Sequence, residues 1–136
     1  MLAALGTRRY AKAVQATSRD KHTRRPNIIF ILVDDLGWYE LGCYGNTFNE
    51  TPNLDRLATE GMRFTDAYAA AAVCSPTRAA LMTGQYPARV GITDYLRPDS
   101  AKHLSTDYLT IAEMLKQAGY ITGIIGKWHL TGYANN

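Results

Sequence analysis

Cys74, Pro76 and Arg78 lie in a short pattern, Cys-Ser-Pro-Thr-Arg, that could place a reactive group in an anion-binding setting. Proline suits the first turn of a helix because it lacks an N–H and its φ is already close to the helical value. The free N–H groups and the dipole of such a helix start favour negative charge. Arg78, one turn further on, can direct its guanidinium back toward Cys74. A lone cysteine is usually a small buried thiol, so other residues must decide whether Cys74 is structural or reactive.

Two further groups of polar residues each follow an apolar run. Asp34 and Asp35 end the run 27–33, and Lys127 and His129 follow the run 120–125. Such runs indicate strands buried on both faces, as in a parallel sheet covered by helices. Ligands of open α/β sheets bind beyond the carboxyl ends of the strands, and adjacent carboxylates repel each other unless a cation or a proton intervenes. We therefore expect these four side chains to meet the Cys-Ser-Pro-Thr-Arg segment at one edge of a sheet.

These motifs resemble the type I sulfatases of the alkaline phosphatase superfamily. The resemblance rests on Cys-Ser-Pro-Thr-Arg at 74–78, Asp-Asp-Leu-Gly-Trp at 34–38, Thr-Pro-Asn-Leu-Asp-Arg-Leu-Ala at 51–58 and Gly-Lys-Trp-His at 126–129. The pattern is most similar to the arylsulfatase and N-acetylgalactosamine-6-sulfatase branch. It extends from Arg25 to about Leu130, nearly all of the chain except its first residues. The order and spacing of these motifs make the resemblance specific, whereas Cys-x-Pro-x-Arg alone would be weak.

The resemblance implies a fold and an activity. The fold is α/β, a partial alkaline-phosphatase-like sandwich with a mostly parallel central sheet and flanking helices. The activity is that of a sulfuric ester hydrolase acting on an aryl or sugar sulfate, either a small molecule or a glycan. A separate maturation enzyme is implied to oxidise Cys74 to formylglycine, whose hydrate carries two hydroxyls on one carbon. One hydroxyl attacks sulfur, and the other, once deprotonated, expels sulfate.

The resemblance also implies roles for the individual side chains. Asp34, Asp35 and the modified Cys74 would bind Ca²⁺, with Mg²⁺ as the other hard cation that suits oxygen ligands. Arg78 would stabilise the nucleophile. Lys127 would contact the sulfate and the nucleophile, and His129 would hydrogen-bond the hydrate or assist proton transfer. The alternative for His129 is a structural histidine. The family's later metal ligands, and its later His and Lys, have no counterpart in these 136 residues.

Length and composition fit a part of such a protein. A chain of 136 residues, 46% of them hydrophobic, is long enough for one small domain and is not of the disordered class. Members of the sulfatase family are several times longer, so we expect residues 26–136 to be the truncated N-terminal part of a catalytic domain. The longest apolar run, 28–33, is strand-sized, and no transmembrane segment is predicted.

The positive charge is concentrated in the first 25 residues. They contain seven basic residues and one acidic residue, against eight basic and eleven acidic residues in the remainder. The sequence therefore predicts a basic, disordered leader at 1–25 and no nucleic-acid partner for the folded part. The apolar start, residues 1–5, is too short for a signal-peptide core and no basic residue precedes it. The family suggests export, whether periplasmic, secreted or lysosomal, but these residues leave the route open.

The rest of the pattern predicts the elements that position the site. Residues 54–59 form a short helix ended by Gly61, residues 62–69 a strand, and a helix begins at Pro76 and ends at Gly84. Residues 85–106 read as a long surface loop. A further helix opens on a capping box at Thr110 and Glu113 and ends at Gly119. Cys43 is predicted to be a small buried residue, not a disulfide partner of Cys74.

Two other functions stay open at this point. A phosphonate monoester or phosphodiester hydrolase of the same superfamily can share the Cys-x-Pro-x-Arg nucleophile. An inactive fragment, which keeps the motifs without a complete metal shell, is the alternative of a different class.

Overall fold

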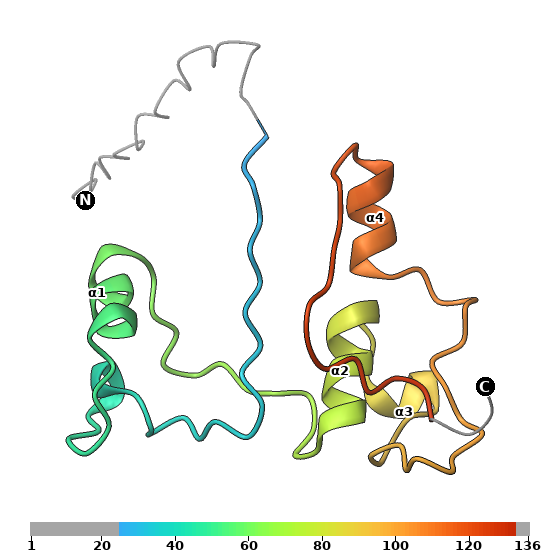
Figure 1. Ribbon diagram of the computed structural model, residues 1–136, viewed down its shortest axis with the longest axis horizontal. Coiled ribbons are helices and arrows are strands. Elements are labelled where there is room, and N and C mark those ends of the chain that lie inside the picture. Colours follow the sequence, from blue (N-terminus) through green and yellow to red (C-terminus); the bar gives the residue numbers. More distant parts are fainter. Residues whose placement is uncertain (1–24, 133–136) are drawn as a thin grey trace, which may run out of the picture. The chain divides into compact units, whose positions relative to one another are not determined.

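The computed structural model describes residues 25–132 and divides the chain into two units, Met1–Leu32 and Val33–Asn136. Of the first unit, residues 25–32 are described, and they follow an extended path with exposed side chains (Figure 1). The predicted leader, residues 1–25, lies outside the described residues except for Arg25. All helices of the described chain belong to the second unit. No helix in residues 25–132 has both the length and the apolar character needed to cross a membrane.

The three predicted strands, 27–33, 62–69 and 120–125, are wrong as strands of this structure. No β-strand is present in the described part of the chain, which holds only an isolated antiparallel bridge between His103 and Thr131. A strand needs a neighbour to pair its N–H and C=O groups, and these segments have none within the described residues. Their apolar side chains are consequently exposed: Ile29 is 85% exposed and Ile121 fully so.

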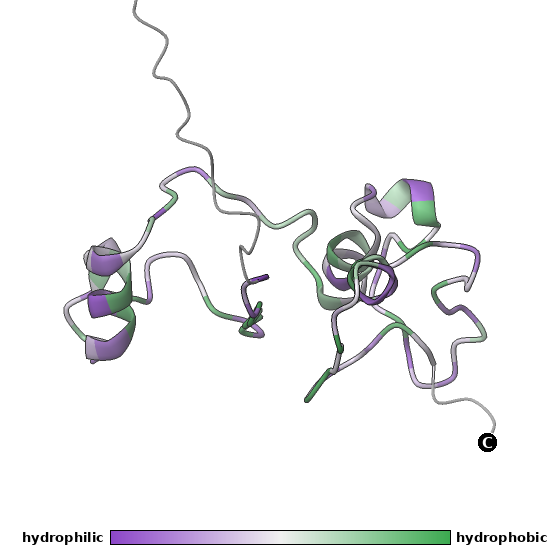
Figure 2. Cartoon of the chain, turned by 90° about the horizontal axis from the view of Figure 1, so that it is seen from above, coloured by the Kyte–Doolittle hydropathy of each residue, from purple (hydrophilic) through white to green (hydrophobic). Residues whose placement is uncertain are grey.

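The first two helical elements are η1, Gly42–Tyr44, and α1, Pro52–Glu60, and they pack on each other. Helix α1 begins two residues before the predicted helix at 54–59 and ends one residue after it, and Pro52 suits its first turn because it has no N–H to leave unpaired. The free N–H groups of the short 3₁₀ turn are bound by the start of α1. Gly42 N donates to Thr51 Oγ1 at 2.8 Å, and Cys43 N donates to Asp55 Oδ1 at 2.6 Å. Thr51 and Asp55 thereby fix the loop that follows the Asp-Asp-Leu-Gly-Trp motif. Figure 2 shows apolar and polar residues on different sides of α1.

Helix α2, Cys74–Thr83, begins two residues earlier than the sequence predicts and makes Cys74 its first residue. Val73, in an extended conformation, is the N-cap, and the hydroxyl of Thr77 donates to Ala71 O at 2.7 Å. Gly84 ends the helix with φ of 67°, the left-handed conformation that favours glycine. The predicted end of this helix is confirmed.

Two further helices pack on α2. Helix α3, Pro87–Val90, lies within the stretch predicted to be a loop, so that prediction is wrong for these four residues; proline begins the helix and Gly91 ends it at φ of 74°. Helix α4, Ile111–Gln117, has the predicted capping box, in which Thr110 and Glu113 bind each other's backbone N–H groups. Gly119 follows at φ of 85°.

The hydrophobic core surrounds α2 and is built mainly from the long connection after it. Its buried members share aliphatic side chains and are Ala79, Val90, Ile92, Leu96, Leu104 and Leu130. Met82 and Tyr108 pack against them. The backbone N–H of Leu104 donates to Leu130 O at 2.9 Å, which anchors the segment after Lys127 and His129 to this core. The core therefore holds the two ends of the candidate site, α2 and residues 127–130, in one place.

Candidate active site

Cys74 is a free, half-buried thiol at the first position of α2. The first N–H groups of a helix have no partner within it, and here the N-cap side chain supplies none. Together with the helix dipole these groups favour an anion beside Cys74. Cys43 is the second free cysteine, and it is half-buried rather than buried as predicted.

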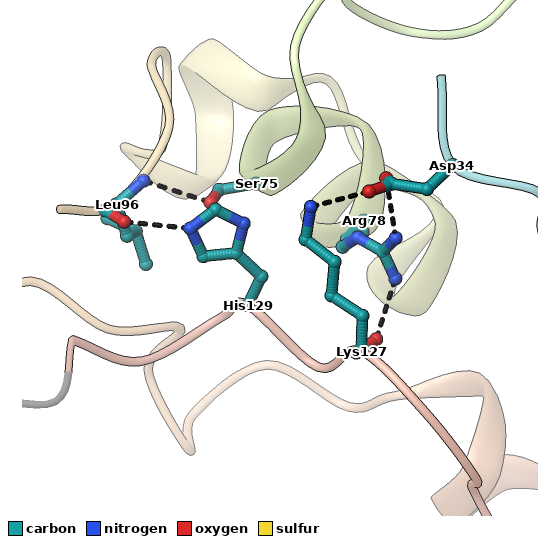
Figure 3. A network of polar contacts seen from close by, with 6 residues as sticks. All are labelled: Asp34, Ser75, Arg78, Leu96, Lys127 and His129. Atoms are coloured by element: carbon teal, nitrogen blue, oxygen red, sulfur yellow. Dashed lines mark hydrogen bonds and ion pairs between the residues drawn. The ribbon is translucent and has the colours of Figure 1, made fainter. Parts of the chain in front are cut away.

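Arg78, one turn into α2, is 9% exposed and makes two hydrogen bonds to distant segments. Its Nη2 lies 2.9 Å from Asp34 Oδ1, and its Nη1 donates to the backbone O of Lys127 at 2.7 Å (Figure 3). The planar guanidinium can satisfy both acceptors at once, which the single ammonium of a lysine cannot do with the same geometry. Arg78 thereby joins the segments that follow the first and the last of the predicted strands.

Lys127 lies on the same carboxylate as Arg78. Its Nζ is 2.6 Å from Asp34 Oδ2, and both side chains are about two-fifths exposed. The hydrogen bond from Lys127, with a smaller effect from Arg78, holds the pKa of Asp34 below its ordinary value of 3.8. The hydrogen bond to Asp34 raises the pKa of Lys127 above 10.5, and the charge of Cys74 adds to this rise despite opposing desolvation. Cys74 lies one helical turn before Arg78, on the helix that carries this group's guanidinium.

Asp35 and His129 are the non-glycine residues with positive φ in the described part of the chain, at 56° and 53°. This conformation is uncommon for residues with a side chain and is often found at functional sites. His129 Nε2 lies 2.8 Å from the backbone O of Leu96, whereas its Nδ1 is buried without a hydrogen-bond partner among residues 25–132. The carboxylate of Asp35 takes no part in the ion pairs of Asp34.

The predicted residues thus divide into two parts. The structure brings Asp34, Arg78 and Lys127 into one hydrogen-bonded group near Cys74, and it binds His129 to the backbone of Leu96 instead. Within the described residues no three acidic, histidine or cysteine side chains are grouped so that they could hold a metal ion. The oxygen donors suit Ca²⁺ in kind, but the two aspartates are too few for a shell of about six to eight ligands.

Ser75 and Leu96 are contacts that the sequence analysis missed. The backbone N–H of Leu96 donates to Ser75 Oγ at 2.9 Å in the interior. The position of Ser75 inside the Cys-Ser-Pro-Thr-Arg pattern could have suggested a role for it. Leu96 participates through its backbone, however, and its side-chain type carries no signal for that.

A family model described as Sulfatase matches residues 26–136 of the chain. The chain belongs to the sulfatase family. This sulfatase is 51% identical to human arylsulfatase A over 108 residues, which are 79% of this chain and 21% of that protein. It is 48% identical over 110 residues to an N-acetylgalactosamine-6-O-sulfatase of Bacteroides thetaiotaomicron, covering 81% of this chain and 22% of that protein. The chain therefore spans about a fifth of the length of these curated relatives.

The likeness extends to a solved structure. A sulfatase from work on the metabolism of multiple glycosaminoglycans by Bacteroides thetaiotaomicron matches with a TM-score of 0.73 and 50% identity, over 78% of this chain and 22% of that one. The predicted fold class, the α/β alkaline-phosphatase-like fold, is confirmed by this likeness. The described residues of this sulfatase carry helices of that fold, while the segments expected in its sheet are unpaired.

Proposed function

We propose that this sulfatase chain supplies the nucleophile and part of the anion-binding site for hydrolysis of sulfate esters. The observation that carries the proposal is the group of Arg78 and Lys127 on Asp34, in which Arg78 lies one turn into the helix whose first residue is Cys74. A sulfate ester is an anion, and its hydrolysis requires fixed positive charge around the group that is transferred. Two cations and the N–H groups of a helix start provide that charge beside one reactive residue.

The nucleophile is formylglycine made from Cys74 by a separate maturation enzyme. The hydrated aldehyde supplies two hydroxyls on one carbon. One loses its proton and attacks sulfur, and the ester S–O bond breaks so that the alcohol leaves with a proton; deprotonation of the other then breaks the C–O bond to the sulfate group, which releases sulfate and re-forms the aldehyde. Arg78 is buried and held by two hydrogen bonds, so its guanidinium is already oriented to stabilise negative charge at position 74. The ammonium of Lys127 is more exposed and turns from Asp34 to the oxygens of the sulfate. His129, whose Nδ1 is buried without a partner among the described residues, accepts a proton from a hydroxyl at position 74.

Asp34 and Asp35 would be two oxygen ligands of the Ca²⁺ or Mg²⁺ that family membership implies. The described residues do not complete the shell, and Asp34 is already bound by Arg78 and Lys127. The metal would polarise the oxygens of the nucleophile and of the sulfate, and the two aspartates would hold part of its ligand shell.

Substrates of this sulfatase belong to the class of sulfate esters, aryl or sugar. The relatives named above are an arylsulfatase and an N-acetylgalactosamine sulfatase, which favours both kinds of leaving group. Export of the protein and an N-terminal leader at residues 1–25 remain part of the same proposal.

The experiment is peptide mass spectrometry after expression with a formylglycine-generating enzyme. We expect the peptide that contains Cys74 to be lighter by the change from thiol to aldehyde, with Cys43 unchanged as an internal control. Arg78→Lys should lower both the modified fraction and aryl sulfate turnover per modified chain, because lysine lacks the planar fork. Arg89→Lys, at an exposed position, is the matched control. An unmodified Cys74, or full turnover by Arg78→Lys, contradicts the proposal.

A further inference from the structure

Leu96 connects the start of α2 to His129 through its own backbone. Its N–H donates to Ser75 Oγ at 2.9 Å, and its C=O lies 2.8 Å from His129 Nε2. Figure 3 shows the ring of His129 between Leu96 and the group formed by Asp34, Arg78 and Lys127. Ser75 directly follows Cys74, so this chain of hydrogen bonds begins beside the proposed nucleophile.

The connection is held in the interior. Ser75 is fully buried, and Leu96 is 5% exposed as a member of the hydrophobic core. Leu130, which follows His129, is also fully buried in that core. Because the side chains of Leu96 and Leu130 are packed in the same cluster, the carbonyl of Leu96 and the backbone of His129 have little freedom to separate.

The hydrogen bond to Leu96 determines which nitrogen of His129 carries the proton. A carbonyl oxygen only accepts, so Nε2 must be the donor. In the neutral ring Nδ1 is then an acceptor, and it is buried with no partner within residues 25–132. The tautomer of a histidine is commonly set in this way by the partner of its other nitrogen.

We propose that Ser75 is a positioning residue for His129. Its hydroxyl holds the N–H of Leu96, the carbonyl of Leu96 holds the Nε2–H tautomer, and Nδ1 is left free to accept a proton. The identity of the proton donor, a hydroxyl at position 74, rests on the proposed function. The arrangement itself makes one residue, next to Cys74, responsible for the orientation of the base.

The tautomer of His129 tests the proposal directly. The full chain is labelled with ¹⁵N at histidine, and the two ring nitrogens are distinguished by their chemical shifts and their couplings to the ring protons. The chain has three histidines, and the signal of His129 is the one lost in His129→Gln. We expect the proton on Nε2. A proton on Nδ1, or an even mixture of the two tautomers, overturns the proposal without any need for a Ser75 variant.

Ser75→Ala tests the part played by the hydroxyl. It leaves the N–H of Leu96 without its acceptor in the interior, so the segment shifts and the carbonyl holds Nε2–H less well. We expect the preference for the Nε2–H tautomer to fall about tenfold, which is about 1.4 kcal/mol. Ser100→Ala is the control, because it removes a comparable bond, from Lys102 N to Ser100 Oγ at 3.1 Å, elsewhere in the same connection. An unchanged preference in Ser75→Ala, with the methyl signals of Leu104 and Leu130 showing an intact core, overturns the role of Ser75.

The two proposals fail in different ways, because the tautomer measurement needs no turnover. A chain with the Nε2–H tautomer in which Cys74 stays unmodified contradicts the proposed function alone. A chain with modified Cys74 in which Nδ1 carries the proton contradicts the positioning role of Ser75 and the proton-accepting role of His129, and it leaves the nucleophile of the proposed function standing.

Discussion

The carboxylate of Asp34 accepts a hydrogen bond from Lys127 Nζ at 2.6 Å, although 93 positions separate the two residues in the sequence. Both side chains are partly exposed, and solvent weakens exposed ion pairs. The same carboxylate also binds Arg78. The importance of Asp34 therefore lies in holding two cations together more than in stabilising the fold.

Asp34→Asn should lower the pKa of Lys127. Asparagine keeps the size of the side chain but removes the negative charge, and the hydrogen bond from Asp34 is the main cause of the raised value. NMR titration of the Lys127 side chain gives the midpoint in both proteins. Glu60→Gln is the control, since it removes an exposed carboxylate from a separate pair with Arg56. A Lys127 midpoint that is the same in Asp34→Asn and in the wild type would contradict this account.

The proximity of Asp34, Arg78 and Lys127 was predictable because each residue follows or begins a recognisable element. Residues after two apolar runs and at the first turn of a helix meet at one edge of an α/β fold. The separation of His129 from the hydrogen-bonded group of the other three side chains was not predictable. The bond of His129 to Leu96 depends on a backbone carbonyl, and φ of 53° at His129 follows from tertiary packing that no local pattern encodes.

The elements themselves show the same limit. The ends of α2 and α4 were predictable because Gly84 and the capping box of Thr110 and Glu113 are local signals. The strands were predicted from hydrophobicity, but pairing requires a neighbouring strand, and none is present within residues 25–132. Helix α3 was missed because its four residues are too short for a periodic pattern, although Pro87 and Gly91 mark its ends.

The contribution of the Asp34–Lys127 pair to stability should be lost at both extremes of pH. The pKa of Asp34 is lowered in the fold, so its contribution is present above the ordinary value of 3.8 and disappears as the pH falls through the lowered value. The pKa of Lys127 is raised, so its contribution is present below 10.5 and disappears as the pH rises through the raised value.

Urea unfolding of the wild type and of Asp34→Asn across pH measures this difference. We expect a constant difference in the free energy of unfolding between about pH 5 and about pH 9, with a decrease outside that range. A difference that peaks near neutral pH instead would point to a titrating group other than these two.

Calcium should bind this chain weakly. Asp34 and Asp35 supply two carboxylates, of which Asp34 is bound by two cations, and the described residues contain no group of three possible ligands. We expect calorimetry to give a dissociation constant of about 1 mM or weaker. Lys127→Ala should tighten binding several-fold because it frees one oxygen of Asp34. Lys102→Ala removes the same charge at an exposed site away from Asp34 and should have little effect. Micromolar binding by the wild type would show that the ion pairs do not compete with the metal.

Gly84→Ala should destabilise the fold through the backbone alone. Gly84 ends α2 at φ of 67°, and a Cβ added there would meet no atom within 4 Å. The left-handed conformation costs a residue with a side chain about 1–2 kcal/mol, and we expect urea unfolding to show a loss of that size. Gly123→Ala is the matched control, because a Cβ at Gly123 also meets nothing within 4 Å and its φ is not positive. Alanine at Gly123 should leave stability unchanged or raise it slightly, since it reduces the freedom of the unfolded chain. If both substitutions have the same effect, the left-handed end of α2 is not what holds Cys74 and Arg78 on a well-formed helix.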